Sequence, residues 1–225
     1  MPDIFDEVSE DLRAEKAQLL FKRYGWAIAA LAVAVVVAAG AWQGWLYYQK
    51  KQDAAASDAF LAAMRQAAQP LGGGQATEEA KKAALAGFEK LAADAPEGYR
   101  TLARLRAAGL KADMGDLPGA LALWDAVAHD DSADKLLRDL ANLLWAQHGI
   151  DAGDPPVVRA RLAALEKPDN PFRALAEEAG ALLDLRLGQT DAAKAALQKL
   201  ASDPTAPEGV HARANGLLDR IGIGG

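Results

Sequence analysis

The sequence contains no cysteine, which excludes disulfide bonds, thiolate nucleophiles and cysteine-based zinc sites together. β-Branched residues are scarce outside residues 28–37, whereas alanine and leucine are abundant. Alanine and leucine favour helices, and β-branched residues favour strands. The composition therefore predicts an all-α protein.

A concentrated basic surface is also missing. The 225 residues carry a formal net charge of −6, and lysine and arginine are spread along the chain rather than gathered in one stretch. Proteins that bind nucleic acids normally displace counterions with clustered cations. We therefore expect no nucleic-acid partner.

The common signatures of catalysis are absent as well. His129, His148 and His211 each lack a second histidine four residues further on, so no helical metal pair is expected. The "GGGQ" stretch has no lysine to complete a phosphate-binding loop. We expect a non-enzymatic protein without cofactor, metal or small-molecule substrate. An anchored envelope enzyme remains a remote alternative, which would require His129 or His148 to meet carboxylates in a pocket.

One long stretch carries no charge, between Arg23 and Lys50. A membrane span needs about 20 mainly apolar residues, and residues 25–48 meet that length. A removable export signal would start nearer the N-terminus and be shorter. A buried helix would need a large surrounding core, which the amphipathic remainder does not supply. We predict a transmembrane helix over residues 24–49.

Aromatic and basic residues flank this stretch in the pattern of membrane-interface anchors. The predicted anchors are Trp26, Trp42, Trp45, Lys50 and Lys51. Within the span, Gly40 and Gly44 form a weak signal for contact with another transmembrane helix, because small residues four apart allow close approach.

The residues before the span, 1–23, form a short leader. Phe5, Val8, Leu12 and Leu19 recur at helical spacing, which predicts an amphipathic helix. Basic residues before the span narrowly outnumber those that follow it within a comparable distance. The bias predicts a cytosolic N-terminus and an extracytoplasmic C-terminal domain.

After the span, residues 50–76 are expected to form a connecting helix, ended by Pro70, and a glycine-rich linker. Residues 77–225 then repeat. Similar helical segments open at Tyr99, Leu136, Phe172 and Val210, at intervals of 37, 36 and 38 residues. This is the period of a repeat built from helical hairpins.

The repeat resembles the tetratricopeptide repeat, in which small residues allow paired helices to approach and a large apolar residue fills the gap beside them. The matching positions are Ala84, Phe88, Gly115, Ala120, Trp124, Gly188, Ala193 and Leu197. The segment "PPVVRARLAALEKPDNP" departs from the pattern because it is short and lacks the aromatic residue. Most aromatic residues of the repeats are expected in the core.

The order of leader, span and repeats resembles the YfgM-type ancillary subunit of the bacterial Sec translocon, in its alphaproteobacterial form. The resemblance implies anchoring in the bacterial inner membrane and a periplasmic repeat domain. It also implies protein partners: Sec translocon subunits, a membrane-anchored periplasmic chaperone and exported chains. A repeat scaffold for envelope assembly or cell division is the alternative.

Overall fold

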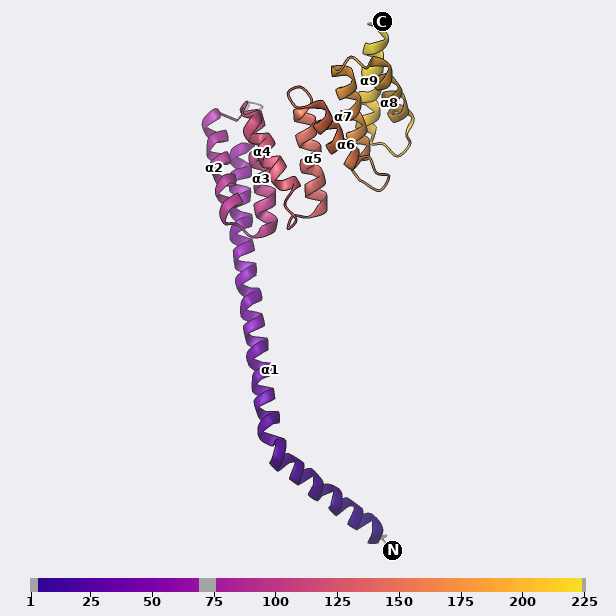
Figure 1. Cartoon of the computed structure of the whole chain (residues 1–225). Helices are drawn as coiled ribbons and strands as arrows, with labels where there is room; N and C mark the ends of the chain where they lie inside the picture. Colours follow the sequence, from indigo (N-terminus) through magenta and orange to yellow (C-terminus); the bar gives the residue numbers. More distant parts are fainter. Residues whose placement is uncertain (1–3, 69–75, 224–225) are drawn as a thin grey trace. The chain divides into compact units, whose positions relative to one another are not determined.

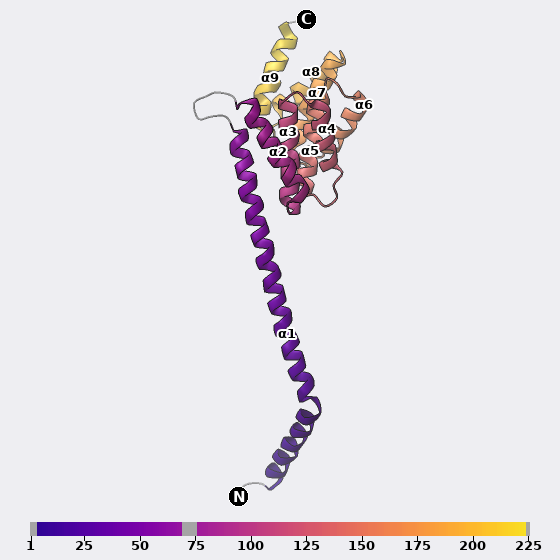
Figure 2. The same ribbon diagram turned by 90° about the vertical axis from the view of Figure 1, so that its left-hand side faces the viewer.

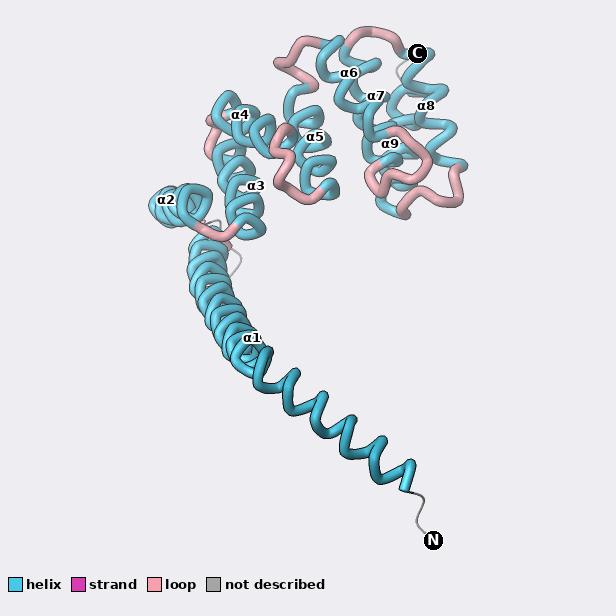
Figure 3. Tube along the Cα trace, turned by 60° about the horizontal axis from the view of Figure 1, so that its bottom comes forward, coloured by secondary structure: helices cyan, strands magenta, loops and turns pink. Residues whose placement is uncertain are grey.

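The computed structural model describes the backbone of residues 4–68 and 76–223, and the side chains of residues 22–68 and 76–222. Within these ranges the regular structure is entirely helical, and short loops join the helices (Figures 1 and 3). The all-α prediction is confirmed. The glycine-rich linker and Pro70 lie outside the described residues, as do the side chains of the apolar leader residues.

The helices follow one another along the chain with short connections. In order they are α1 (Ile4–Ala67), α2 (Glu78–Asp94), α3 (Glu97–Asp113), α4 (Leu117–Ala128), α5 (Lys135–Gly149), α6 (Pro155–Leu165), α7 (Arg173–Arg186), α8 (Thr190–Ser202) and α9 (Glu208–Ile223). The contacts divide the chain into two units, Met1–Gln52 and Asp53–Gly225.

The first unit consists of the N-terminal part of α1. Among the described residues, one helical stretch is long and apolar enough to cross a membrane, and its apolar window has a mean hydropathy of 2.0 with no buried residue. Trp26, Trp42 and Trp45 are all exposed in this unit. A Cβ added at Gly40 or Gly44 would meet no atom within 4 Å, so both glycines leave open space on the helix.

The second unit is a stack of helical hairpins. Each helix from α2 to α9 packs on the next one along the chain (Figure 2). The sequence starts several of these helices with a capping side chain: Thr77 accepts a hydrogen bond from the Ala80 amide, and Asp116 accepts one from the Gly119 amide. Such caps satisfy amides that have no partner within the helix. The core runs through the stack as successive apolar clusters.

The end of α1 belongs to this stack. Ala56 and Ala63 are buried with Phe88 of α2, and the Phe60 ring contacts that of Phe88 edge-on, with centroids 5.4 Å apart. A Cβ added at Gly87 would lie 3.2 Å from the Ala63 Cβ, so the two helices approach closely at these residues. Residues 53–67 therefore supply the first helix of the first hairpin, in addition to connecting it to the preceding segment.

Candidate protein-interaction surface

Two positions, four residues apart, repeat in the second helix of every hairpin. The first is Ala84, Ala120, Val158 and Ala193, all with no exposed surface. The second is Phe88, Trp124, Leu162 and Leu197, each at most 1% exposed. Residues four apart lie on one helix face, so this face carries the contacts that hold the hairpins together.

Sequence reasoning missed Val158 and Leu162, which fill these positions in the third hairpin. Their spacing of four residues was the available signal, but valine in place of alanine obscured it. α6 contacts its neighbours α5 and α7 less extensively than α4 and α8 contact theirs, and it is also the shortest helix of the stack. The short helix and missing aromatic residue of this segment are therefore accommodated without loss of the repeat.

The first helices also carry a small residue that the sequence argument did not identify. Ala108, Ala146 and Ala181 lie twelve residues before Ala120, Val158 and Ala193, and all three are essentially buried. Ala108 shares an apolar cluster with Ala120 and Trp124. Small residues on both helices of a hairpin permit a short distance between their axes.

Gly115 and Gly188 form the turns between the helices of two hairpins. Both adopt positive φ, 86° and 72°, which favours glycine. The following residues repeat the same hydrogen bond: the Asp116 amide donates to the Lys111 carbonyl and the Gln189 amide to the Asp184 carbonyl, each at 2.8 Å. Both turns thus have the same C-terminal cap geometry.

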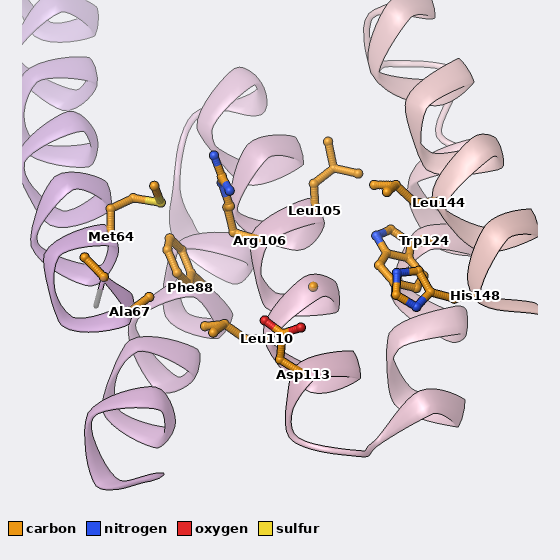
Figure 4. Close-up of a pocket in the computed structure, with 12 residues that line it drawn as sticks. Met64, Ala67, Phe88, Leu105, Arg106, Leu110, Asp113, Trp124, Leu144 and His148 are labelled. Carbon is orange, nitrogen blue, oxygen red and sulfur yellow. The ribbon is translucent and has the colours of Figure 1, made fainter. Parts of the chain in front are cut away.

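The first helices of three successive hairpins enclose a hollow of about 400 Å³, which we name the α1–α3–α5 hollow. It is lined by Met64, Ala67, Ala68, Phe88, Leu105, Arg106, Gly109, Leu110, Asp113, Trp124, Leu144 and His148. In Figure 4, Met64 and Phe88 lie at one end, and Trp124, Leu144 and His148 lie at the other. The lining is mainly apolar with a few charged groups, as in most binding sites.

Trp124 and His148 form a stacked pair in this hollow, with ring centroids 4.7 Å apart and an interplanar angle of 26°. Trp124 is buried whereas His148 is exposed. The Trp124 Nε1 is buried and has no hydrogen-bond partner among the described residues. Such an unpaired donor is rare inside proteins, because burial without a partner costs about 1–3 kcal/mol.

A second hollow, of about 450 Å³, lies between α7 and α9. Its wall carries an ion pair between the exposed Arg213 and the buried Glu178: Nε and one terminal nitrogen of Arg213 donate to the two carboxylate oxygens of Glu178, both at 2.6 Å. This pairing raises the pKa of Arg213, mainly through the side-chain hydrogen bond to Glu178. Arg220, Leu182 and Leu217 complete much of the lining.

Other ion pairs join helices and loops that do not follow one another directly in the chain. Arg161 of α6 pairs with Asp125 of α4, and its guanidinium lies 4.1 Å from the centroid of the Trp145 ring. Arg173 of α7 donates to Asp203 at 2.6 Å, in the loop after α8. Hydrogen bonds from Thr205 and from Arg173 hold the pKa of Asp203 below its ordinary value of 3.8. These pairs connect residues distant in sequence.

The carboxylates and histidines do not assemble a metal site within the described residues. His148 and Asp113 both line the α1–α3–α5 hollow, but no hydrogen bond joins them in this part of the chain. His129 contacts Asp125 in an exposed turn, and His211 hydrogen-bonds the Asp203 carbonyl. The absence of a metal site thus stays a prediction from the sequence.

These features define an all-helical repeat protein whose stacked hairpins present hollowed faces, the architecture of protein-interaction scaffolds. Comparison with protein families gives the particular assignment. A family described as tetratricopeptide repeat-like domain matches residues 19–214, which is most of the chain. The chain belongs to this tetratricopeptide repeat-like family. Searches of curated proteins and of solved structures found no match.

Proposed function

We propose that this protein is a single-pass membrane protein whose repeat domain binds other proteins on the periplasmic side of the bacterial inner membrane. One observation carries the proposal: the family match includes both the apolar stretch of α1 and the hairpin stack. An apolar window without a single buried residue needs a lipid or protein environment. A repeat domain at the membrane is concentrated near membrane-bound partners.

The membrane-facing part of the proposal rests on particular residues. Trp26 lies near one end of the apolar stretch, with Trp42 and Trp45 near the other, and all three side chains are exposed for an interfacial position. Lys50 and Lys51, also exposed, would mark the periplasmic boundary. The open surface at Gly40 and Gly44 would admit a partner's transmembrane helix.

The proposed role is that of an accessory of the Sec translocon, which helps to transfer exported chains to a membrane-anchored periplasmic chaperone. The order of leader, span and repeat domain supports it, as does the mixed apolar and charged lining of the two hollows, which suits polypeptide segments better than small ligands. This proposed binding role requires no cofactor.

Photo-crosslinking in intact membranes tests this role. A photoreactive amino acid replaces His148, which is exposed in the α1–α3–α5 hollow, and a matched variant carries it at Ala122, which is exposed on α4 and does not line that hollow. We expect translocon or chaperone subunits to be captured from position 148 and much less from position 122. Capture of only cell-division or peptidoglycan-synthesis proteins from position 148 would favour the envelope-scaffold alternative and overturn the translocon assignment.

A further inference from the structure

α6 is the least extensively packed helix of the hairpin stack. It is the shortest helix of the stack, and it contacts α5 and α7 less extensively than α4 and α8 contact their neighbours. Parts of a protein with few packed contacts open at the lowest free energy. The junction formed by α5, α6 and α7 is therefore the place where the stack bends most easily.

More extensive contacts hold together the helices on either side of this junction. On one side, the end of α1 and α2–α5 form two apolar clusters, and Leu123 packs against both. We name these helices the N-terminal block. On the other side, α7, α8 and α9 share a cluster that includes Leu197, Leu200 and Val210, and we name them the C-terminal block. Figures 1 and 3 show α2, α3 and α4 on one side of the junction and α8 and α9 on the other.

Arg161 of α6 ties this helix to the N-terminal block. Its side chain is 16% exposed. One terminal nitrogen donates to Asn142 of α5 at 2.9 Å, and the other donates to Asp125 of α4. The guanidinium also lies 4.1 Å from the centroid of the Trp145 ring of α5. Because the donors of arginine form a rigid planar fork, all three contacts are made together only at one position of α6.

Other polar contacts tie α6 to the C-terminal block. Arg159 of α6 pairs with the buried Asp184 of α7. Arg186 of α7 donates to the carbonyls of Ile150 and Gly153, in the loop before α6. These contacts do not involve the N-terminal partners of Arg161. Release of Arg161 would therefore leave α6 attached to the C-terminal block.

The two blocks stay joined when Arg161 is released. Leu143 of α5, Leu162 of α6 and Leu183 of α7 are buried in one apolar cluster at the junction. Asn170, in the loop after α6, also donates a hydrogen bond to Asp139 of α5 at 2.9 Å. An apolar cluster permits small sliding of the helices that share it, whereas separating them would expose it to water.

We propose that α6 is a hinge and that Arg161 is the latch that holds this hinge at one angle. When Arg161 leaves Asp125 and Asn142, α6 and the C-terminal block rotate together about the apolar cluster of the junction. Each hollow keeps its shape, because the α1–α3–α5 hollow is lined by the N-terminal block and the second hollow by the C-terminal block. The distance and angle between the two hollows change.

The functional consequence rests on the proposed protein-binding role of the repeat domain. A partner that contacts both blocks fits them at one angle. The latched stack is preorganised for such a partner, whereas a released stack must lose conformational freedom to bind it. Arg161 thereby regulates binding without touching the partner.

Spin labels on the full-length chain in lipid nanodiscs test the hinge. The chain contains no cysteine, so two introduced cysteines take the labels without removal of a native one. One pair joins the blocks, at the exposed residues Ala122 of α4 and Ala195 of α8. A second pair lies within the N-terminal block, at the exposed residues Ala86 of α2 and Ala122. Double electron–electron resonance measures the distance distribution of each pair. We expect Arg161→Met to widen the distribution between the blocks at least twofold and to leave the other unchanged.

Arg173→Met is the matched control. The Arg173 side chain is 18% exposed, close to that of Arg161, and it pairs with Glu177 and Asp203 inside the C-terminal block. Its loss removes an equally enclosed arginine and should leave both distributions unchanged. Asp125→Ala removes the partner of the latch at a side chain that is 46% exposed, so it tests the hinge even where Arg161→Met folds poorly. It should widen the distribution as Arg161→Met does, and the double variant should be no wider than either.

Three results would each overturn the inference. They are an unchanged distribution between the blocks in Asp125→Ala, equal widening by Arg173→Met, and widening of the pair within the N-terminal block by Asp125→Ala. The last result would mean that the latch stabilises the fold in general rather than one angle. These distances are measured without any partner, so their failure leaves crosslinking from position 148 unaffected. Failure of the hinge is thus distinguishable from failure of the proposed function.

Discussion

Ala120 and Ala122 lie on opposite sides of α4 although they are two residues apart. Ala120 has no exposed surface, whereas Ala122 is exposed. A helix turns about 200° over two residues, so only one of them can face the paired helix. The burial of Ala108 in the same cluster shows which contact requires the small side chain.

Substitution of Ala120 by leucine should therefore overpack this contact and lower the free energy of unfolding by about 1–3 kcal/mol. The same change at Ala122 adds atoms to an exposed surface and should alter it by less than about 0.5 kcal/mol. Urea unfolding of the two variants, followed by circular dichroism, measures both values. Equal losses, or a larger loss at Ala122, would show that the repeat register is wrong.

Asp203 gives the loop after α8 a pH-dependent anchor. Its carboxylate accepts hydrogen bonds from the Thr205 hydroxyl at 2.7 Å, the Thr205 amide at 2.8 Å and Arg173 at 2.6 Å. Because these donors favour the charged form, they hold the pKa below the ordinary value of 3.8. A depressed pKa stabilises the fold above the unfolded-state value, and that contribution is lost as the pH falls through the folded-state value.

The Asp203→Asn variant should accordingly unfold more easily than the unaltered chain at pH 7. The difference between them should narrow as the pH falls below about 4, where the unfolded carboxyl takes up protons. Thermal melts across this range, with exposed Asp169→Asn as the control, measure it. If the difference in melting temperature between the variant and the unaltered chain grew on acidification, the pKa of Asp203 would not be lowered in the folded state.

At the scale of elements, the end of α1 is the first helix of the hairpin stack. The Phe60 ring contacts those of Phe88 and Tyr99, and Ala56 and Ala63 bury the same cluster. Without this helix, Phe88 would be left beside water, although it has no exposed surface in the structure. Burial of one large apolar side chain contributes about 1.5–3 kcal/mol.

A soluble fragment of residues 53–225 should thus be more stable than one of residues 77–225 by at least about 2 kcal/mol. Urea titrations of the two fragments measure the difference. Phe60→Ala in the longer fragment serves as a control, since it removes one ring and keeps the helix. If both fragments have the same midpoint, residues 53–67 only connect the two units. A strand-rich spectrum of the longer fragment would contradict the helical fold itself.

At the scale of the whole molecule, the proposal depends on which side of the membrane the hairpin stack occupies. Proteolysis of cells with opened outer membranes distinguishes the two orientations. We expect protease to digest the repeat domain and to leave an N-terminal tag protected, because long C-terminal domains cross the membrane largely regardless of charge. A digested tag with a protected repeat domain would reverse the proposed topology. A shortened N-terminus, shown by mass spectrometry, would mean that the span is a removable signal.

The sequence by itself determined the local features of this protein. Helical periodicity is a property of neighbouring residues, so the all-helical class, the long apolar stretch and the spacing of the hairpins were predictable from the chain alone. The spacing repeated within the chain also located Phe88 and Trp124 among the aromatic residues of the repeats, and both are buried.

Tertiary structure decided which surfaces of those helices meet. Residues 53–67 belong to the hairpin stack because the small side chain of Ala63 lies close to Gly87 of the paired helix. A short stretch of sequence does not reveal this contact. Trp145 is only partly buried beneath Arg161, whereas Trp124 is enclosed. The α1–α3–α5 hollow draws its lining from five helices, so its residues become a site only when distant segments pack together. Burial and hollows depend on long-range neighbours, and helical periodicity does not encode them.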